Sequence, residues 1–167
     1  MTNQTRFLQE LGPNLQKITK RLLSNQNLLR YLSYTDKDPL STDKPDISKE
    51  EAYKDGATGV VRVVPLISDK EDSSSILTLR VLKGVPSTEN SEFLEIYFAI
   101  EIFVPLKQWV IKDANLRTYA IMGEVQRSLE GKRINGLGEI RGSGFSANFF
   151  TEEMSAYIMS FSILQFN

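Results

Sequence analysis

The sequence predicts an α+β fold: a mostly antiparallel, twisted sheet of about five strands, with an N-terminal helix and a second helix packed on one face. Two hydrophobic patterns lead to this prediction. Residues 4–34 and 114–130 carry apolar side chains at three-to-four spacing, which is typical of helices lying on a core. The stretch Glu92–Lys112 instead alternates every second residue, which is typical of a strand with one dry face. The predicted order is helix, three strands, helix, two strands.

The length of 167 residues suits a single domain spanning 1–167. Within this domain we expect an N-terminal helical segment over 4–34, an exposed loop over 35–56 and a sheet-and-helix core over 57–167.

The N-terminal segment contains two expected interruptions. Gly12-Pro13 predicts a kink or a separate short helix, and residues 24–27 (SNQN) predict a break and a new cap. Its polar side carries the basic residues Lys17, Lys20 and Arg21. These residues form either a solvated helix face or a site for an anion or an acidic partner.

Residues 35–56 have few apolar side chains and two prolines, which is typical of a long exposed loop. Loops of this length in compact domains are usually functional or disordered. Asp36 and Asp38 are its candidate contact residues. Ser48 and Glu51 have the spacing of a capping box, which predicts one turn of helix.

The strand over 92–105 is the predicted centre of the sheet. One parity, from Leu94 to Val104, is entirely apolar, and we expect the helices to cover it. The other parity mixes apolar, polar and acidic side chains. Pro105 ends the strand, and residues 108–112 are expected to form a short separate strand.

Two strands are expected before the central one, over 57–67 and 75–83, joined as a hairpin by the turn 68–74. A polar connection over 84–91 follows, with Pro65 at a sheet edge.

The second helix, over 114–130, has Asp113 or Asn115 as its expected cap and Gly131 just beyond its end. Residues 134–145 predict a glycine-rich turn at Asn135-Gly136 and a strand, and residues 154–166 predict a final strand.

Composition argues against several classes of function. The chain has no cysteine and no histidine, which removes thiol chemistry, the commonest general base and the commonest metal ligand. Glu95 and Glu101 lie too far apart along one strand to act as an acid/base pair. We therefore expect no enzyme, no cofactor and no metal. A net charge of −1 argues against a general nucleic-acid binder, and no apolar run is long enough to cross a membrane.

Large apolar groups on the mixed parity point to an assembly surface. The candidate interface residues of the sheet are Glu95, Tyr97, Glu101, Phe103, Phe149 and Phe150. Exposed apolar patches usually mark interfaces. The alternative is that these aromatic rings pack under loops of the same chain.

Three stretches carry a resemblance to a known family. They are NLLRYLSYTDKDPLS at Asn27–Ser41, EVQRSLEGKRINGLGEIRGSGF at Glu124–Phe145, and the central pattern I-x-I-x-V-P-x-x-x-W at Ile100–Trp109. Together they resemble the tail terminator, or tail-completion, proteins of the neck of contractile-tailed bacteriophages. The resemblance covers most of the chain, from about Leu15 to Phe145, with loose motifs and no catalytic signature.

The resemblance implies a structural virion protein that forms a homo-oligomeric ring, typically a homohexamer. Such a ring caps the tail tube and sheath and joins the tail to the head connector, and DNA passes through its lumen. The head-closure and adaptor rings of the neck are the alternative tiers. A third alternative is a monomeric binding module that uses the basic N-terminal helix.

Overall fold

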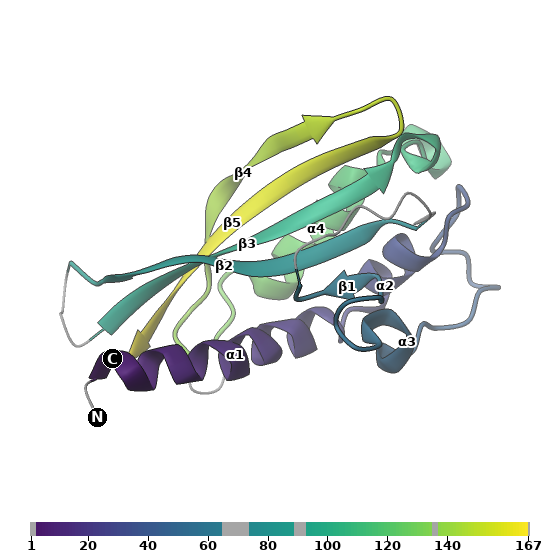
Figure 1. The fold of residues 1–167 in the computed structure, drawn as a ribbon. Coiled ribbons are helices and arrows are strands. Elements are labelled where there is room, and N and C mark those ends of the chain that lie inside the picture. The colour runs from purple at the N-terminus through teal and green to yellow at the C-terminus, as the bar shows by residue number, and fades with distance from the viewer. Residues whose placement is uncertain (1–2, 65–73, 89–92, 135–136, 167) are drawn as a thin grey trace.

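The computed structural model describes residues 3–64, 74–88, 93–134 and 137–166 (Figure 1). Its helices are α1 (Asn3–Leu22), α2 (Gln26–Ser33), α3 (Lys49–Tyr53) and α4 (Arg117–Leu129). Its strands are β1 (Val61–Arg62), β2 (Ile76–Pro86), β3 (Phe93–Pro105), β4 (Arg141–Phe150) and β5 (Met154–Phe166). The predicted α+β class is confirmed.

The five strands form one sheet in the order β1-β2-β3-β5-β4, with β3 at the centre as expected. All neighbouring pairs are antiparallel except β1 and β2. β3 and β5 pair along their full lengths, from Phe93 with Phe166 to Pro105 with Met154. Phe98 and Phe161 face each other in this register, and their rings stack with centroids 5.5 Å apart.

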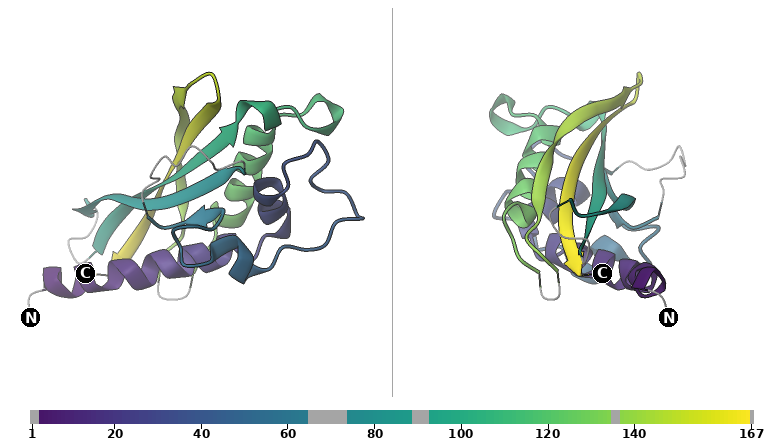
Figure 2. Two further views of the ribbon diagram at one scale, coloured as in Figure 1. Left: turned by 45° about the vertical axis from the view of Figure 1, so that its right-hand side comes forward. Right: turned by 90° about the vertical axis from the view of Figure 1, so that its left-hand side faces the viewer.

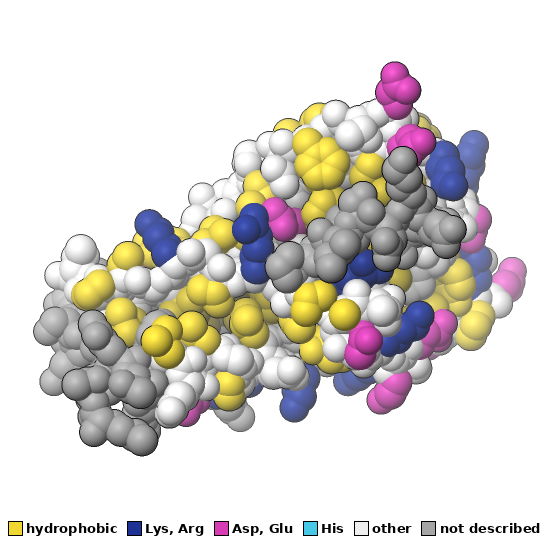
Figure 3. All heavy atoms as spheres, in the orientation of Figure 1, with side chains coloured by type: hydrophobic (Ala, Val, Ile, Leu, Met, Phe, Trp, Pro, Cys, Tyr) yellow, Lys and Arg dark blue, Asp and Glu magenta, His cyan; other side chains and the backbone are white. Residues whose placement is uncertain are grey.

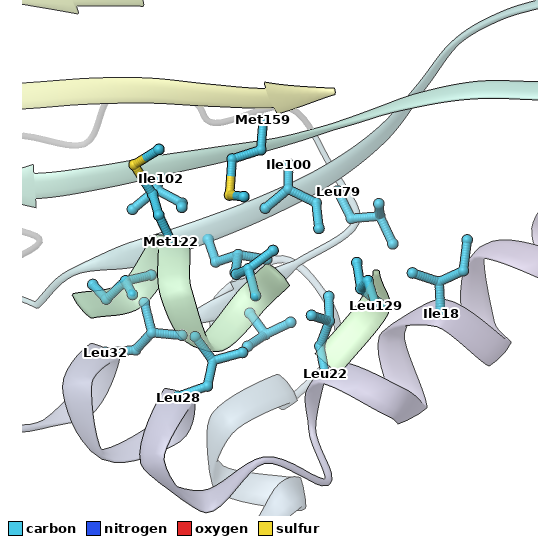
Figure 4. Packing of buried hydrophobic residues seen from close by; sticks show 14 of the residues in the cluster. Ile18, Leu22, Leu28, Leu32, Leu79, Ile100, Ile102, Met122, Leu129 and Met159 are labelled. Atoms are coloured by element: carbon cyan, nitrogen blue, oxygen red, sulfur yellow. The ribbon is translucent and has the colours of Figure 1, made fainter. Parts of the chain in front are cut away.

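The helices cover one face of the sheet, with α4 behind the strands in Figure 1 and the sheet seen almost edge-on in the right panel of Figure 2. The apolar parity of β3 is buried throughout: Leu94, Ile96, Phe98, Ile100, Ile102 and Val104. Figure 4 shows Ile100 and Ile102 in the same buried cluster as side chains from the helices, among them Leu22, Leu28 and Met122. Burying each such side chain contributes about 1.5–3 kcal/mol, so this layer holds the fold together.

Two of the predicted helix caps are confirmed and one is wrong. Asn25 caps α2 by accepting a hydrogen bond from the Leu28 N–H, and Ser48 caps α3 by accepting one from the Glu51 N–H. The cap of α4 is Leu116, without a side-chain hydrogen bond, so the expectation of Asp113 or Asn115 was wrong.

Two further signals concern helix α1 and the end of α4. Pro13 lies inside α1, which runs on from Asn3 to Leu22 without a separate first helix. Gly131 has φ +66° just beyond α4, as a glycine at that position predicts.

Three strand predictions were wrong in detail. β1 has only two residues and runs parallel to β2, so the two do not form a hairpin. Parallel strands need a longer crossover than a tight turn provides. β2 continues to Pro86 where a polar connection was expected, and residues 106–108 and 112–114 form 3₁₀ turns instead of a strand. Three further predictions lie wholly or mostly outside the described residues: the turn 68–74, the edge position of Pro65 and the turn at Asn135-Gly136.

Candidate interface surfaces

The second face of β3 is more enclosed than its sequence predicts. Glu101 is only 9% exposed and accepts hydrogen bonds from Arg80 at 2.8 Å, and from Thr78 and Asn148 at 3.4 Å. Its donors come from the neighbouring strand β2 and from β4. A buried carboxylate needs such partners because desolvation penalises its charged form. Glu101 therefore connects β3 to β2 and β4 by side-chain hydrogen bonds and is not free to contact a partner.

Glu95 and Tyr97, at the other end of β3, are half-buried and remain accessible. A hydrogen bond between their side chains raises the pKa of the Tyr97 phenol above its ordinary value. The Lys83 ammonium lies 4.6 Å from the centre of the Tyr97 ring, a cation–π distance. These two candidates stay available for a partner.

Phe103 is 5% exposed, so the expectation that a monomer would show it at the surface was wrong. It packs with Ile76 and Ala156, and the Phe149 ring covers it at a centroid distance of 5.9 Å. The alternative interpretation, packing within the same chain, is therefore correct for Phe103. Phe149 itself remains 41% exposed and forms the outer layer.

Phe150 belongs to an aromatic cluster on the helix side of the sheet. Its ring stacks on Trp109 at 5.8 Å and meets the edge of Tyr157 at 5.7 Å. Tyr157 in turn contacts Tyr119 of α4, with their hydroxyl oxygens 3.2 Å apart, and this hydrogen bond raises the pKa of Tyr157. Phe150 and Tyr119 remain 51% and 46% exposed, so the cluster is open to solvent on one side.

Edge strand β4 is the most exposed element of the sheet, because all ten of its residues are exposed. Phe145 is 66% exposed, and sequence reasoning missed it because the predicted strand ended there. The signal was available: residues 141–150 contain a single charged residue and three phenylalanines. Bulges interrupt the pairing of β4 with β5 between Gly142 and Gly144 and between Ala147 and Phe149.

The start of the loop 35–56 is tightly bound to the body of the protein. Asp36 pairs with Lys44, whose hydrogen bond lowers the pKa of the Asp36 carboxyl. Asp38 pairs with Lys112 at 3.0 Å, which raises the pKa of that lysine. Arg30 donates to the carbonyl oxygens of the loop residues Leu40, Ser41 and Lys44. The loop is thus a shaped protrusion, held mainly by side chains that bind its carbonyls.

Arg117 is the central anchor of this region. It is fully buried, and its guanidinium donates to the carbonyl oxygens of Gln108 at 3.0 Å, Tyr31 at 2.7 Å, Tyr34 and Asp36. Burial lowers the pKa of Arg117, partly offset by nearby Asp36. Sequence reasoning missed it. A positive charge at the first position of a helix is unfavourable, because the N-terminal end of the helix dipole is also positive. This was the one sequence signal that Arg117 binds groups outside its own helix.

The basic residues of α1 differ in how far their side chains are bound within the chain. Arg21 donates from Nε to the Ser128 carbonyl at 3.2 Å, which joins α1 to α4. Half-buried Lys17 donates to Asn14 at 3.3 Å. Lys20 alone of the three is exposed without a side-chain hydrogen bond to a described residue.

A hollow of about 680 Å³ lies where β3, β5 and the segment before β4 meet. Its charged lining residues are Glu95, Arg133, Glu139 and Arg141. No group of three or more acidic side chains in the described part of the chain could hold a metal ion. Among the described helices, none is long and apolar enough to cross a membrane.

No curated protein matches the chain. A family model described as YomW matches residues 25–163, which takes in everything from α2 to most of β5. With most of its length matched, the chain belongs to the YomW family.

Proposed function

We propose that this protein is a structural component of a bacteriophage virion that assembles into a ring at the neck, where it terminates the tail and joins it to the head connector. The ring is built from identical copies, typically six. The proposal rests on the resemblance to tail terminator proteins and on the surface of strand β4.

The three stretches that carry the resemblance take defined places in the fold. Asn27–Ser41 forms α2 and the first part of the bound loop, and Ile100–Trp109 runs from the centre of the sheet to the Arg117 anchor. Glu124–Phe145 runs from the end of α4 into β4. The resemblance thus covers both the core and the outer edge of the sheet.

Strand β4 is the observation that carries the proposal. Three phenylalanine side chains, Phe145, Phe149 and Phe150, are between 41% and 66% exposed on one edge strand. Open sheet edges with apolar side chains are a hazard for a monomer in solution. Association with another subunit covers both the backbone edge and the rings, so this surface supports an assembly protein over a monomeric module or an enzyme.

The loop 35–47 gives the subunit a second feature suited to assembly. It projects from the body at the end remote from both termini (Figure 2). Because Arg30 and Arg117 hold its carbonyl groups, its shape exists before any partner binds. A preformed protrusion loses less conformational entropy on binding than a disordered arm does.

The test combines native mass spectrometry of the purified protein with electron cryomicroscopy of phage particles. We expect a closed ring of identical copies located between the tail and the head connector. A ring at another neck tier would support the head-closure or adaptor alternative. A strictly monomeric protein that is absent from the particle would refute the proposal.

A further inference from the structure

Helix α1 changes from exposed to buried about halfway along its length. Residues 8–13 are exposed or half-buried, and Leu8 among them is 65% exposed. The first buried side chain among those described is Asn14, and Ile18 and Leu22 follow it at helical spacing on the same face. The C-terminal half of α1 therefore belongs to the core, whereas residues 8–13 lie at its margin.

Hydrogen bonds to other elements follow the same division. The Asn14 side-chain amide donates to the Gln165 side-chain oxygen of β5 at 2.6 Å, in the interior. Arg21 donates to the Ser128 carbonyl of α4 at 3.2 Å. Side chains 8–13 form no hydrogen bond or ion pair with another described residue. Among the described side chains, polar attachment to other elements therefore begins at Asn14.

The helix backbone is weakest at the same point. Pro13 lies inside α1 and has no N–H group, so the carbonyl of Gln9 loses its helical partner. The proline ring also crowds that carbonyl and disfavours a helical backbone at the preceding residue. That residue is Gly12, which is exposed and has open space where a side chain would begin. The helix therefore resists bending least at Gly12-Pro13.

A small apolar hollow lies between α1 and the sheet. It is lined by Leu11 and Leu15 from the helix and, among strand residues, by Val81, Ile96 and Ile163. Of the described side chains before the proline, only Leu11 packs against the core, and it is half-buried. In Figure 3, hydrophobic side chains run in a band along β2 above α1. The described side chains before the proline are thus held to the core by one half-buried leucine.

We propose that residues 3–12 form a hinged arm that bends away from the sheet at Gly12-Pro13 while residues 14–22 stay in place. With the arm closed, Leu11 helps to cover the apolar hollow. With the arm open, Leu11 leaves the hollow and the side chain of Val81 becomes more accessible. The arm thus controls how much apolar surface this end of the molecule presents. It does so within a single chain, independently of the proposed ring.

Spin-label distances test the hinge, because the chain contains no cysteine and labels can be placed at chosen positions. One double variant combines Gln9→Cys on the arm with Val110→Cys, which follows the far end of β3. The matched pair combines Lys20→Cys, exposed on the anchored half, with the same Val110→Cys. Both are labelled with nitroxides and diluted into unlabelled protein, so that pulsed electron resonance measures distances within one chain.

The Gln9 pair should give two distinct distances, for the closed and the open arm, and the Lys20 pair should give one. Equally narrow single distances for both pairs would overturn the hinge. A single broad distribution for the Gln9 pair would also overturn it, because an unravelled helix end has no second preferred position.

Removal of the proline tests where the bend lies. Pro13→Ala should reduce the open fraction by roughly a factor of ten or more, because alanine restores the hydrogen bond to Gln9 and strongly favours a continuous helix. The Pro13 side chain is exposed, so this change removes no buried packing. Pro45→Ala, at an exposed proline outside α1, is the matched control and should leave the two distances unchanged. Two distances that persist in Pro13→Ala, or that vanish equally in Pro45→Ala, would refute a hinge at this position.

Discussion

Replacing Arg117 with methionine should strongly destabilise the protein, because this buried side chain donates to four backbone carbonyl groups. Methionine fills a similar volume but donates no hydrogen bond. The carbonyls of Tyr34, at the end of α2, and of Asp36, in the loop, are near the surface, where water can replace the lost donors. The hydrogen bond to the Gln108 carbonyl is buried, whereas those to Tyr31, Tyr34 and Asp36 are part-buried.

The magnitude follows from leaving the Gln108 carbonyl and the part-buried Tyr31 carbonyl without a donor. An unsatisfied buried acceptor costs about 1–3 kcal/mol, so two of them cost about 2–6 kcal/mol. Methionine also avoids the desolvation of a buried guanidinium, and this gain offsets part of the loss. We expect the free energy of unfolding to fall by about 3 kcal/mol, and the melting temperature by about 10 °C at this chain length.

Urea unfolding followed by circular dichroism measures this loss. Arg117→Lys keeps the charge but presents a single nitrogen, so its loss should be intermediate. Lys112→Met is the control, because it breaks only an exposed ion pair with Asp38, worth less than about 1 kcal/mol. Hydrogen exchange of the amides in residues 37–47 should accelerate in Arg117→Met and not in the control. A change below about 1 kcal/mol in Arg117→Met would refute the role assigned to this anchor.

Three further predictions concern the core, a helix cap and acid stability. Ile100→Asp should unfold the protein, because an unpaired buried carboxylate costs several kcal/mol at a fully buried position; a native circular dichroism spectrum would contradict the assignment of the dry face. Asn25→Ala should cost about 1–2 kcal/mol in urea unfolding, because it removes the cap of α2 and the hydrogen bonds to Glu124 and Ser128; an unchanged midpoint would contradict it. Backbone N–H groups hold the pKa of Asp55 below its ordinary value, so its contribution is present above about pH 4 and lost as the pH falls through the folded-state pKa. Asp55→Asn should therefore lose less stability on acidification than the wild type does, and equal losses would contradict this.

The interface candidates divide into those that the structure leaves available and those that it encloses. Glu95, Tyr97, Phe149 and Phe150 remain accessible, while Glu101 and Phe103 are covered by β2 and β4. The enclosed pair could not be identified from the alternation of β3 alone. Their burial depends on Asn148 and Phe149. Both residues belong to β4, which follows α4 in the sequence and is far from β3 along the chain.

The sequence by itself determined the helices, the central strand and its dry face. Spacing of apolar residues decides these features locally, because each element must bury one stripe or one parity regardless of what covers it. Asn25 and Ser48 were predictable for the same reason, since a cap depends on residues two or three positions away.

Only the tertiary structure decided the parallel placement of β1, the enclosure of Glu101 and the position of Arg117. Each depends on partners that are not neighbours in the sequence. Arg117 binds carbonyl groups of α2 and of the loop after it. β1 pairs with β2 in parallel, whereas the two strands of a hairpin are antiparallel. The exposed edge at β4 is likewise a property of the sheet order. No single strand reveals whether it has one neighbour or two, because backbone hydrogen bonding between strands leaves little trace in the side-chain pattern.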